Sequence, residues 1–147
     1  MLFQLQENHR IEIFTFEEKC IPIDALQSSR SFNLTWYDYA REYKPQGVPL
    51  LTSHDILRFD IDNFKFELTN SGAKIMSELE VPGKGIPVQL VIDGEVAYGA
   101  WIWNIFSSRA CDGVMFEMMG GDTHSLHIRS FSEQGKSLRI PKMLKQD

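Results

Sequence analysis

Cysteine and long apolar runs are both scarce in this chain. Its 147 residues include only two cysteines, Cys20 and Cys111, which lie 91 positions apart. Such a pair builds no disulfide framework and lacks the close spacing of a zinc site. The longest stretch without a charge or a turn pair, residues 96–108, has 13 residues, whereas about 20 are needed to span a bilayer. The first ten residues also lack the basic and apolar segments of a secretory signal. We therefore expect a soluble, cytoplasmic protein with reduced thiols and no membrane contact.

Basic residues are fewer than acidic residues as well. The chain has 15 Lys and Arg against 20 Asp and Glu, and its formal net charge is −5. The charges are unevenly placed, because residues 1–135 carry 19 acids and 11 bases, whereas the basic C-terminal segment 136–147 carries four bases and one acid. An acidic body repels phosphate backbones, so nucleic-acid binding is disfavoured and a charged partner is expected to be a basic protein.

Enough apolar material is present for one core. Apolar residues make up 43% of the chain, and its length is usual for a single domain. Neither compositional bias nor an internal repeat suggests disorder or a repeat array. We expect one domain over residues 1–147.

The clearest local pattern lies at residues 57–68. Apolar residues occupy odd positions up to Ile61 and even positions from Phe64, so the parity changes across Asp62-Asn63. This change predicts a β-hairpin with a two-residue turn. The expected pairs are Ile61 with Phe64, Phe59 with Phe66 and Leu57 with Leu68 on a buried face, and Asp60 with Lys65 and Arg58 with Glu67 on a wet face.

A second hairpin is predicted at Asp93-Gly94, because this dipeptide readily supplies the two positive φ angles of a type I′ turn. The strand after the turn is apolar on both faces, so we expect it in the middle of a sheet that is covered on both sides. Gly99 within it predicts a close backbone approach or a bulge. The alternation places Val96, Tyr98, Ala100, Ile102 and Phe106 on one face, and Ala97, Gly99, Trp101, Trp103 and Ile105 on the other.

The rest of the chain favours short strands over helices. Only one helix is predicted, at residues 36–43, where Thr35 and Asp38 resemble a capping box and Pro45 prevents continuation. The fold class that follows is α+β, predominantly antiparallel, as a hairpin meander curled into a half-barrel or sandwich with one short helix. Further strands are expected at residues 2–6, 10–16, 74–81, 114–119, 124–131 and 137–140.

Residues that suggest catalysis or metal binding each have a simpler explanation. His124 and His127 point to opposite faces of a strand and lack further ligands, so we expect no metal site. His54-Asp55 resembles an oriented base, but Asp55 equally fits a turn. The paired glycines do not lead into a helix and so do not form a phosphate loop. No cofactor is expected.

The loop at residues 107–113 offers one alternative site. Cys111 near Arg109 could act as a nucleophile, or the loop could bind an anion, although Asp112-Gly113 already fits a turn. A small-molecule pocket or an active site on the concave sheet face is the second functional hypothesis. Its residues would be Ser107, Ser108, Arg109, Cys111, Trp101 and Trp103, with Phe116 and Met118 as further lining.

The first functional hypothesis is a non-catalytic binding protein. Its concrete form is a small bacterial immunity or inhibitor protein that neutralises a basic toxin, such as a nuclease, with carboxylates in place of phosphates. A third hypothesis is a homodimer that closes the apolar face around Trp101 and Trp103. The carboxylates expected to bind a basic partner are Asp60, Asp62, Glu67, Glu12, Glu17 and Glu18.

Overall fold

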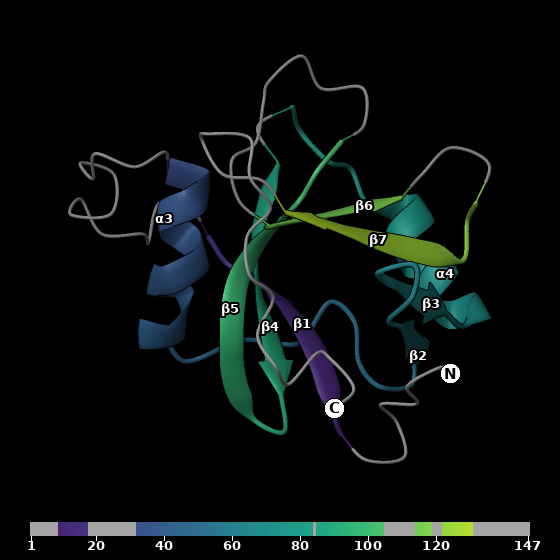
Figure 1. The fold of residues 1–147 in the computed structure, drawn as a ribbon, viewed down its shortest axis with the longest axis horizontal. Coiled ribbons are helices and arrows are strands. Elements are labelled where there is room, and N and C mark those ends of the chain that lie inside the picture. Colours follow the sequence, from purple (N-terminus) through teal and green to yellow (C-terminus); the bar gives the residue numbers. More distant parts are fainter. Residues whose placement is uncertain (1–8, 18–31, 84, 105–113, 119–121, 131–147) are drawn as a thin grey trace.

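The computed structural model describes residues 9–17, 32–83, 85–104, 114–118 and 122–130. Within these ranges, seven strands form one curled, half-barrel sheet in the order β1-β4-β5-β6-β7-β3-β2, and two short α-helices accompany it (Figure 1). The predicted α+β class with a dominant antiparallel sheet is confirmed. The elements are β1 (Ile11–Thr15), α3 (Phe32–Tyr39), the 3-10 helix η2 (Ala40–Glu42), β2 (Ile56–Asp60), β3 (Lys65–Leu68), α4 (Asn70–Glu78), β4 (Ile86–Ile92), β5 (Glu95–Ile102), β6 (Val114–Met118) and β7 (Ser125–Ser130).

The β4–β5 hairpin forms as predicted at its turn. Asp93 and Gly94 have φ angles of 52° and 85°, as a type I′ turn requires. A bulge at Ala97 then lets Val91 pair with Val96 while Leu90 pairs with Tyr98. Because one extra residue shifts the alternation, Ala97 packs in the main core with Tyr98, and Val96 packs beside the tryptophans. Val96 and Ala97 therefore lie on the faces opposite to those predicted.

The β2–β3 hairpin has the predicted pairing in its middle. Arg58 pairs with Glu67, and the two neighbouring predicted pairs also form. Leu57, however, lies in a bulge and is 53% exposed, while Ile56 takes its place opposite Leu68. The last paired residues are Asp60 and Lys65, so the turn has four residues instead of the predicted two.

The predicted antiparallel meander is wrong between β5 and β6. These strands pair in parallel, with Trp101 opposite Met115 and Ile102 opposite Phe116. The paired stretch is short because only the end of β5 reaches β6. Figure 1 shows β5, β4 and β1 side by side, with β7 running away from them at a steep angle in this view.

Helix α3 lies against β5 and begins earlier than predicted. Its first residue is Phe32, so Thr35 lies inside the helix and does not cap it. The helix continues as η2 to Glu42, which agrees with the predicted end before Pro45. A Cβ on Gly99 would lie 2.3 Å from the Trp36 carbonyl oxygen, so the expected close approach at Gly99 is confirmed.

Helix α4 replaces the strand predicted at residues 74–81. The side chain of Thr69 accepts a hydrogen bond from the Gly72 amide and caps the helix. Ser71 in the first turn donates to the Asp55 carboxylate at 2.7 Å. These contacts join the start of α4 to the segment before β2.

Two apolar clusters occupy opposite faces of the sheet. The larger lies on the inner face, and the smaller lies between α3 and the β5 side of the outer face. Its buried residues are Trp36, Ala40, Trp101, Trp103 and Met115. The larger cluster includes Ile11, Ile13, Phe59, Phe66, Leu90, Tyr98, Phe116 and Leu126.

Several predictions fall outside the described residues. These are the strands at residues 2–6 and 137–140, the loop with Ser107, Ser108, Arg109 and Cys111, the carboxylate of Glu18, and the basic segment 136–147. Within the described ranges, no helix is long and apolar enough to cross a membrane.

Candidate functional site: a pocket at the end of strand β1

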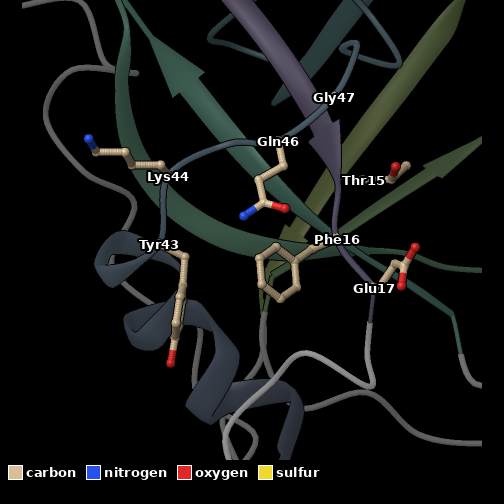
Figure 2. Close-up of a pocket in the computed structure, with 7 residues that line it drawn as sticks. All are labelled: Thr15, Phe16, Glu17, Tyr43, Lys44, Gln46 and Gly47. Carbon is tan, nitrogen blue, oxygen red and sulfur yellow. The ribbon is translucent and has the colours of Figure 1, made fainter.

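A pocket of about 520 Å³ opens where the chain leaves β1 and passes the segment after η2 (Figure 2). This volume is within the usual range of small-ligand sites, roughly 300–1,000 Å³. Its lining combines aromatic rings with an ammonium, a carboxylate, an amide and a hydroxyl. The lining residues are Thr15, Phe16, Glu17, Tyr43, Lys44, Gln46 and Gly47.

An aromatic wall is built around Phe16. Its ring centroid lies 4.8 Å from that of Trp36 and 5.6 Å from that of Tyr43. The Phe16 amide donates to the Pro87 carbonyl at 2.9 Å, which holds this residue beside β4 after β1 has ended. The rings therefore present a fixed apolar surface to the pocket.

A buried glutamine holds the other side of the pocket. Gln89 is fully buried, and its Nε2 donates to the Ala40 carbonyl at 3.0 Å and to the Tyr43 carbonyl at 2.8 Å. These carbonyls belong to the first residue of η2 and to the residue that follows it, where the chain leaves helical geometry. Gly47 then takes a φ of 78°, a conformation that glycine adopts without strain.

The polar groups of the pocket lie at its rim. Lys44, Gln46, Glu17 and Thr15 are all exposed. Figure 2 shows Lys44 and Glu17 on opposite sides of Phe16, with the Gln46 amide between them. In this view the Lys44 ammonium and the Glu17 carboxylate point away from Phe16 and from each other.

The carboxylates of the β2–β3 hairpin are used within the hairpin itself. Asp60 is only 5% exposed and accepts bonds from the amides of Asp62 and Asn63, at 3.1 and 3.2 Å, and from Asn63 Nδ2 at 2.8 Å. The bond from the Asn63 side chain is the main reason that the pKa of Asp60 is lowered. Glu67 forms an ion pair with Arg58. The prediction that Asp60 lies in a wet ion pair is wrong, because the turn uses its carboxylate.

Three other predicted carboxylates differ in their surroundings. Asp62 is exposed at the hairpin turn, and Glu17 is exposed at the pocket rim. Glu12 is half-buried and forms an ion pair with Arg10 at 3.3 Å. Since Glu12 belongs to β1 and Asp62 follows β2, these carboxylates come from opposite edges of the sheet order.

A charged row that the sequence analysis missed crosses the outer face beside α3. Glu117, His127, Lys65 and Asp60 are consecutive register partners on β6, β7, β3 and β2. Glu117 is buried and accepts a bond from Arg129 Nη1 at 3.0 Å. The alternation of β6 contains this signal, because Glu117 interrupts an otherwise apolar strand.

The predicted pocket tryptophans are core residues. Trp101 is 1% exposed and Trp103 is 8% exposed, and both pack in the cluster under α3. Phe116 belongs to the cluster on the other face. The strand face that suggested a homodimer is therefore covered by α3.

Of the candidate catalytic or metal-binding residues, His124 and Asp55 have structural partners. His124 Nε2 lies 2.9 Å from Asn70 Oδ1, and its Nδ1 lies 2.9 Å from the Thr123 hydroxyl. Burial tends to raise the pKa of Asp55, but hydrogen bonds from Ser71 and Thr52 outweigh burial and lower it. In the part of the chain that the structure describes, no three His, Cys, Asp or Glu side chains are grouped to hold a metal.

Sequence reasoning missed this pocket because its residues belong to no motif. Residues 43–47 were interpreted only as the end of a helix, and Phe16 only as the last residue of a strand. The available signal was a Pro and a Gly next to an aromatic and a basic residue, which is common in ordinary loops. Comparison of the chain with protein-family models, curated proteins and solved structures finds no match.

Proposed function

We propose that this protein is a non-catalytic binding protein whose partner is a basic protein. The observation that carries the proposal is the balance of charge at exposed positions in the described ranges. The exposed bases are Arg10, Arg41, Lys44, Lys74 and Arg129. The exposed acids are more numerous: Glu17, Asp38, Glu42, Asp62, Glu78, Glu80, Asp93 and Glu95.

Three of the exposed bases form ion pairs within the chain, two of them with acids that are not exposed. Arg129 is paired with Glu117, Arg10 with Glu12, and Lys74 with Glu78 at 4.0 Å. Among the described residues, three of the five exposed bases are therefore already paired within the chain. An acidic surface attracts basic proteins and accelerates their association. One concrete form is a bacterial immunity protein that neutralises a basic toxin such as a nuclease.

Native mass spectrometry of the protein purified gently from its host tests the proposal. We expect a basic protein retained at fixed stoichiometry. A protein that is always recovered without a protein partner, or with an acidic one, contradicts the proposal.

Charge reversal then locates the interface. We expect Asp62→Lys to slow association and to weaken its salt dependence, because the exposed turn would no longer attract the partner. Glu78→Lys changes the net charge equally and serves as the matched control. Equal effects of the two variants would exclude a local role for the turn.

The pocket of Figure 2 supports a second candidate function, the binding of a small molecule. Its fixed aromatic wall and polar rim are the usual composition of such sites. This site replaces the pocket expected around Trp101 and Trp103, which are buried.

A further inference from the structure

We propose that the pocket at the end of β1 binds an extended peptide, which pairs in antiparallel with the backbone of Thr15 and adds a short strand to this edge of the sheet. The inference rests on the second candidate function, ligand binding in this pocket, and it names the class of ligand.

The backbone groups of Thr15 point away from β4. The Phe16 amide donates to the Pro87 carbonyl of β4. The Ile13 amide donates in the opposite direction, to the Leu51 carbonyl at 2.9 Å. In an antiparallel pair, successive residues direct their N–H and C=O groups alternately toward and away from the partner strand. Because the register of β1 with β4 has no break, Thr15 directs both groups outward, as Ile13 does.

The chain covers this outer edge of β1 only as far as Ile13. The Ile13 carbonyl accepts a hydrogen bond from the Leu50 amide at 2.7 Å, and Ile13 forms an antiparallel bridge with Leu51. Continuing this register would place Pro49 opposite Thr15. Proline has no N–H to donate to the Thr15 carbonyl, so the pairing ends there. Among the described residues, no backbone hydrogen bond reaches Thr15 on this side.

The pocket opens at the place where the pairing ends. Thr15 is exposed and lines one side of the pocket, and residues 43–47 line the other (Figure 2). The volume of about 520 Å³ admits a short peptide. A peptide residue opposite Thr15 can accept from its N–H and donate to its C=O, an exchange that Pro49 cannot make. Open strand edges are a common site at which extended peptides add to a sheet.

The neighbouring peptide residue would lie beside Phe16. Side chains of paired residues lie on the same face of a sheet, so this one meets the ring of Phe16, whose centroid is 5.6 Å from that of Tyr43. An aromatic side chain suits this wall. The bridge register places Leu50 opposite Phe14, so the peptide ends at the residue that pairs with Thr15.

Capped tripeptides test the inference by NMR titration of the full chain. The reference probe is N-acetyl-Ser-Phe-Val-amide, whose valine is the residue that pairs with Thr15. One derivative is N-methylated at valine, whose N–H would donate to Thr15. The matched control is N-methylated at phenylalanine, whose N–H points away from β1. We expect the valine derivative to bind about two- to tenfold more weakly, the effect of one lost hydrogen bond, and the control to bind like the reference.

Two variants of Thr15 test the second hydrogen bond. Thr15→Pro removes the outward N–H, and proline is tolerated at an edge position of this kind. Thr15→Ala keeps the N–H and is the matched control. We expect Thr15→Pro to weaken binding of the reference probe about two- to tenfold and Thr15→Ala to leave it unchanged. Equal affinities in the two variants would overturn the pairing, and if Thr15→Pro does not fold, the N-methyl series decides alone.

Indole, which has an aromatic ring but no peptide group, separates this inference from the function on which it rests. If probes shift the signals of Phe16 and Gly47 but methylation of valine has no larger effect than methylation of phenylalanine, the pocket binds ligands and strand addition is wrong. Binding of indole without binding of the reference peptide has the same meaning. If neither indole nor any peptide shifts these signals, both proposals fail.

Discussion

The two hairpins of the sheet, β4–β5 and β2–β3, have similar sequence patterns but different surroundings. The β4–β5 hairpin lies between β1 and β6, and α3 covers its outer face. The β2–β3 hairpin lies at the edge of the sheet that is farthest from β1, and only its inner face is apolar. The β4–β5 hairpin is thus stabilised by apolar packing on both faces, and the β2–β3 hairpin mainly by packing on its inner face.

Their turns differ in the same way. Asp93-Gly94 adopts positive φ angles with residues suited to them, whereas the β2–β3 turn places Phe64 at a φ of 51°. The second turn depends on the Asp60 carboxylate, which binds the backbone and the side chain of the turn. The difference shows that an unfavourable turn residue can be tolerated when a neighbouring side chain supplies the missing hydrogen bonds.

The largest loss of stability is expected from a substitution on the inner face of the β2–β3 hairpin. Phe66 is fully buried and its ring contacts those of Phe59 and Phe116. We expect Phe66→Ala to lower the free energy of unfolding by about 3–5 kcal/mol, measured by urea denaturation. Leu57→Ala in the same hairpin should cost about 0.5 kcal/mol or less, because Leu57 is exposed. Similar losses for both variants would contradict the one-sided burial of this hairpin.

The next largest loss of stability is expected at the contact between α3 and the β4–β5 hairpin. A Cβ on Gly99 would lie 2.3 Å from backbone oxygen, so Gly99→Ala requires the helix to move. We expect a loss of about 1–3 kcal/mol in the free energy of unfolding, measured by urea denaturation. Gly47→Ala is the control, since it meets no atom within 4 Å and adds only the strain of its positive φ, about 1 kcal/mol. A neutral Gly99→Ala would show that α3 does not pack closely on β5.

The two turn carboxylates predict acid sensitivity at both hairpins. The pKa of Asp93 is lowered mainly by the hydrogen bond from His9, and that of Asp60 mainly by the bond from Asn63. A lowered folded-state pKa stabilises the fold at pH values above the ordinary 3.8, and this contribution is lost as the pH falls through the folded-state pKa.

Denaturation of Asp60→Asn and Asp93→Asn between pH 6 and pH 2.5 checks this prediction. Each variant should be less stable than the parent chain at pH 6, and the difference should shrink below about pH 4. A difference that stays constant with pH would mean that these carboxylates act through packing alone.

The smallest effect concerns a buried hydroxyl in the central hairpin. Tyr98 Oη has no hydrogen-bond partner among the described residues, and burial raises the pKa of Tyr98 well above its ordinary value. Tyr98→Phe should therefore be neutral or stabilise the fold by up to about 1 kcal/mol, because it removes an unpaired buried group. A clear loss of stability in thermal denaturation would show that the hydroxyl has a partner.

Local pattern was sufficient to predict the hairpins but not their bulges. Alternation and turn residues identified both strand pairs, because these pairings involve neighbouring segments of the chain. The bulges at Leu57 and Ala97 were missed, since each depends on packing against distant elements. At Ala97, for example, the Arg41 Nε donates to the bulged carbonyl at 2.8 Å.

The errors at α4 and β6 have a related cause. Asn70-Ser71-Gly72 was interpreted as a turn before a strand, although Ala73 and Met76 have the spacing of one buried helix face. The contact of Ser71 with Asp55 stabilises the helix start from another segment. The parallel pairing of β5 with β6 involves only two residues of each strand, so the sequence carries almost no signal for it.

The candidate site was the least predictable part of the molecule. Of the described residues that were expected to bind a partner, only Glu17 lines the pocket. The other pocket residues come from the end of β1 and the segment after η2. Gln89 on β4, the neighbour of β1, holds this segment through the carbonyls of Ala40 in η2 and Tyr43 after it. The available signal was a glutamine within the apolar strand β4, but the sequence does not indicate which carbonyls this glutamine binds.

The short pairing of β5 with β6 also bears on aggregation. No described strand pairs with the first half of β5 on the side of β6, and open strand edges recruit strands of other molecules. Here Arg41 binds the Ala97 carbonyl, and Tyr37 stacks on Tyr98 with ring centroids 5.2 Å apart. Helix α3 and the following η2 thus cover this edge of β5. Their transient detachment would expose the edge together with Trp101 and Trp103. Conditions that loosen this helix, such as mild heating, should therefore produce insoluble material well before the rest of the sheet unfolds.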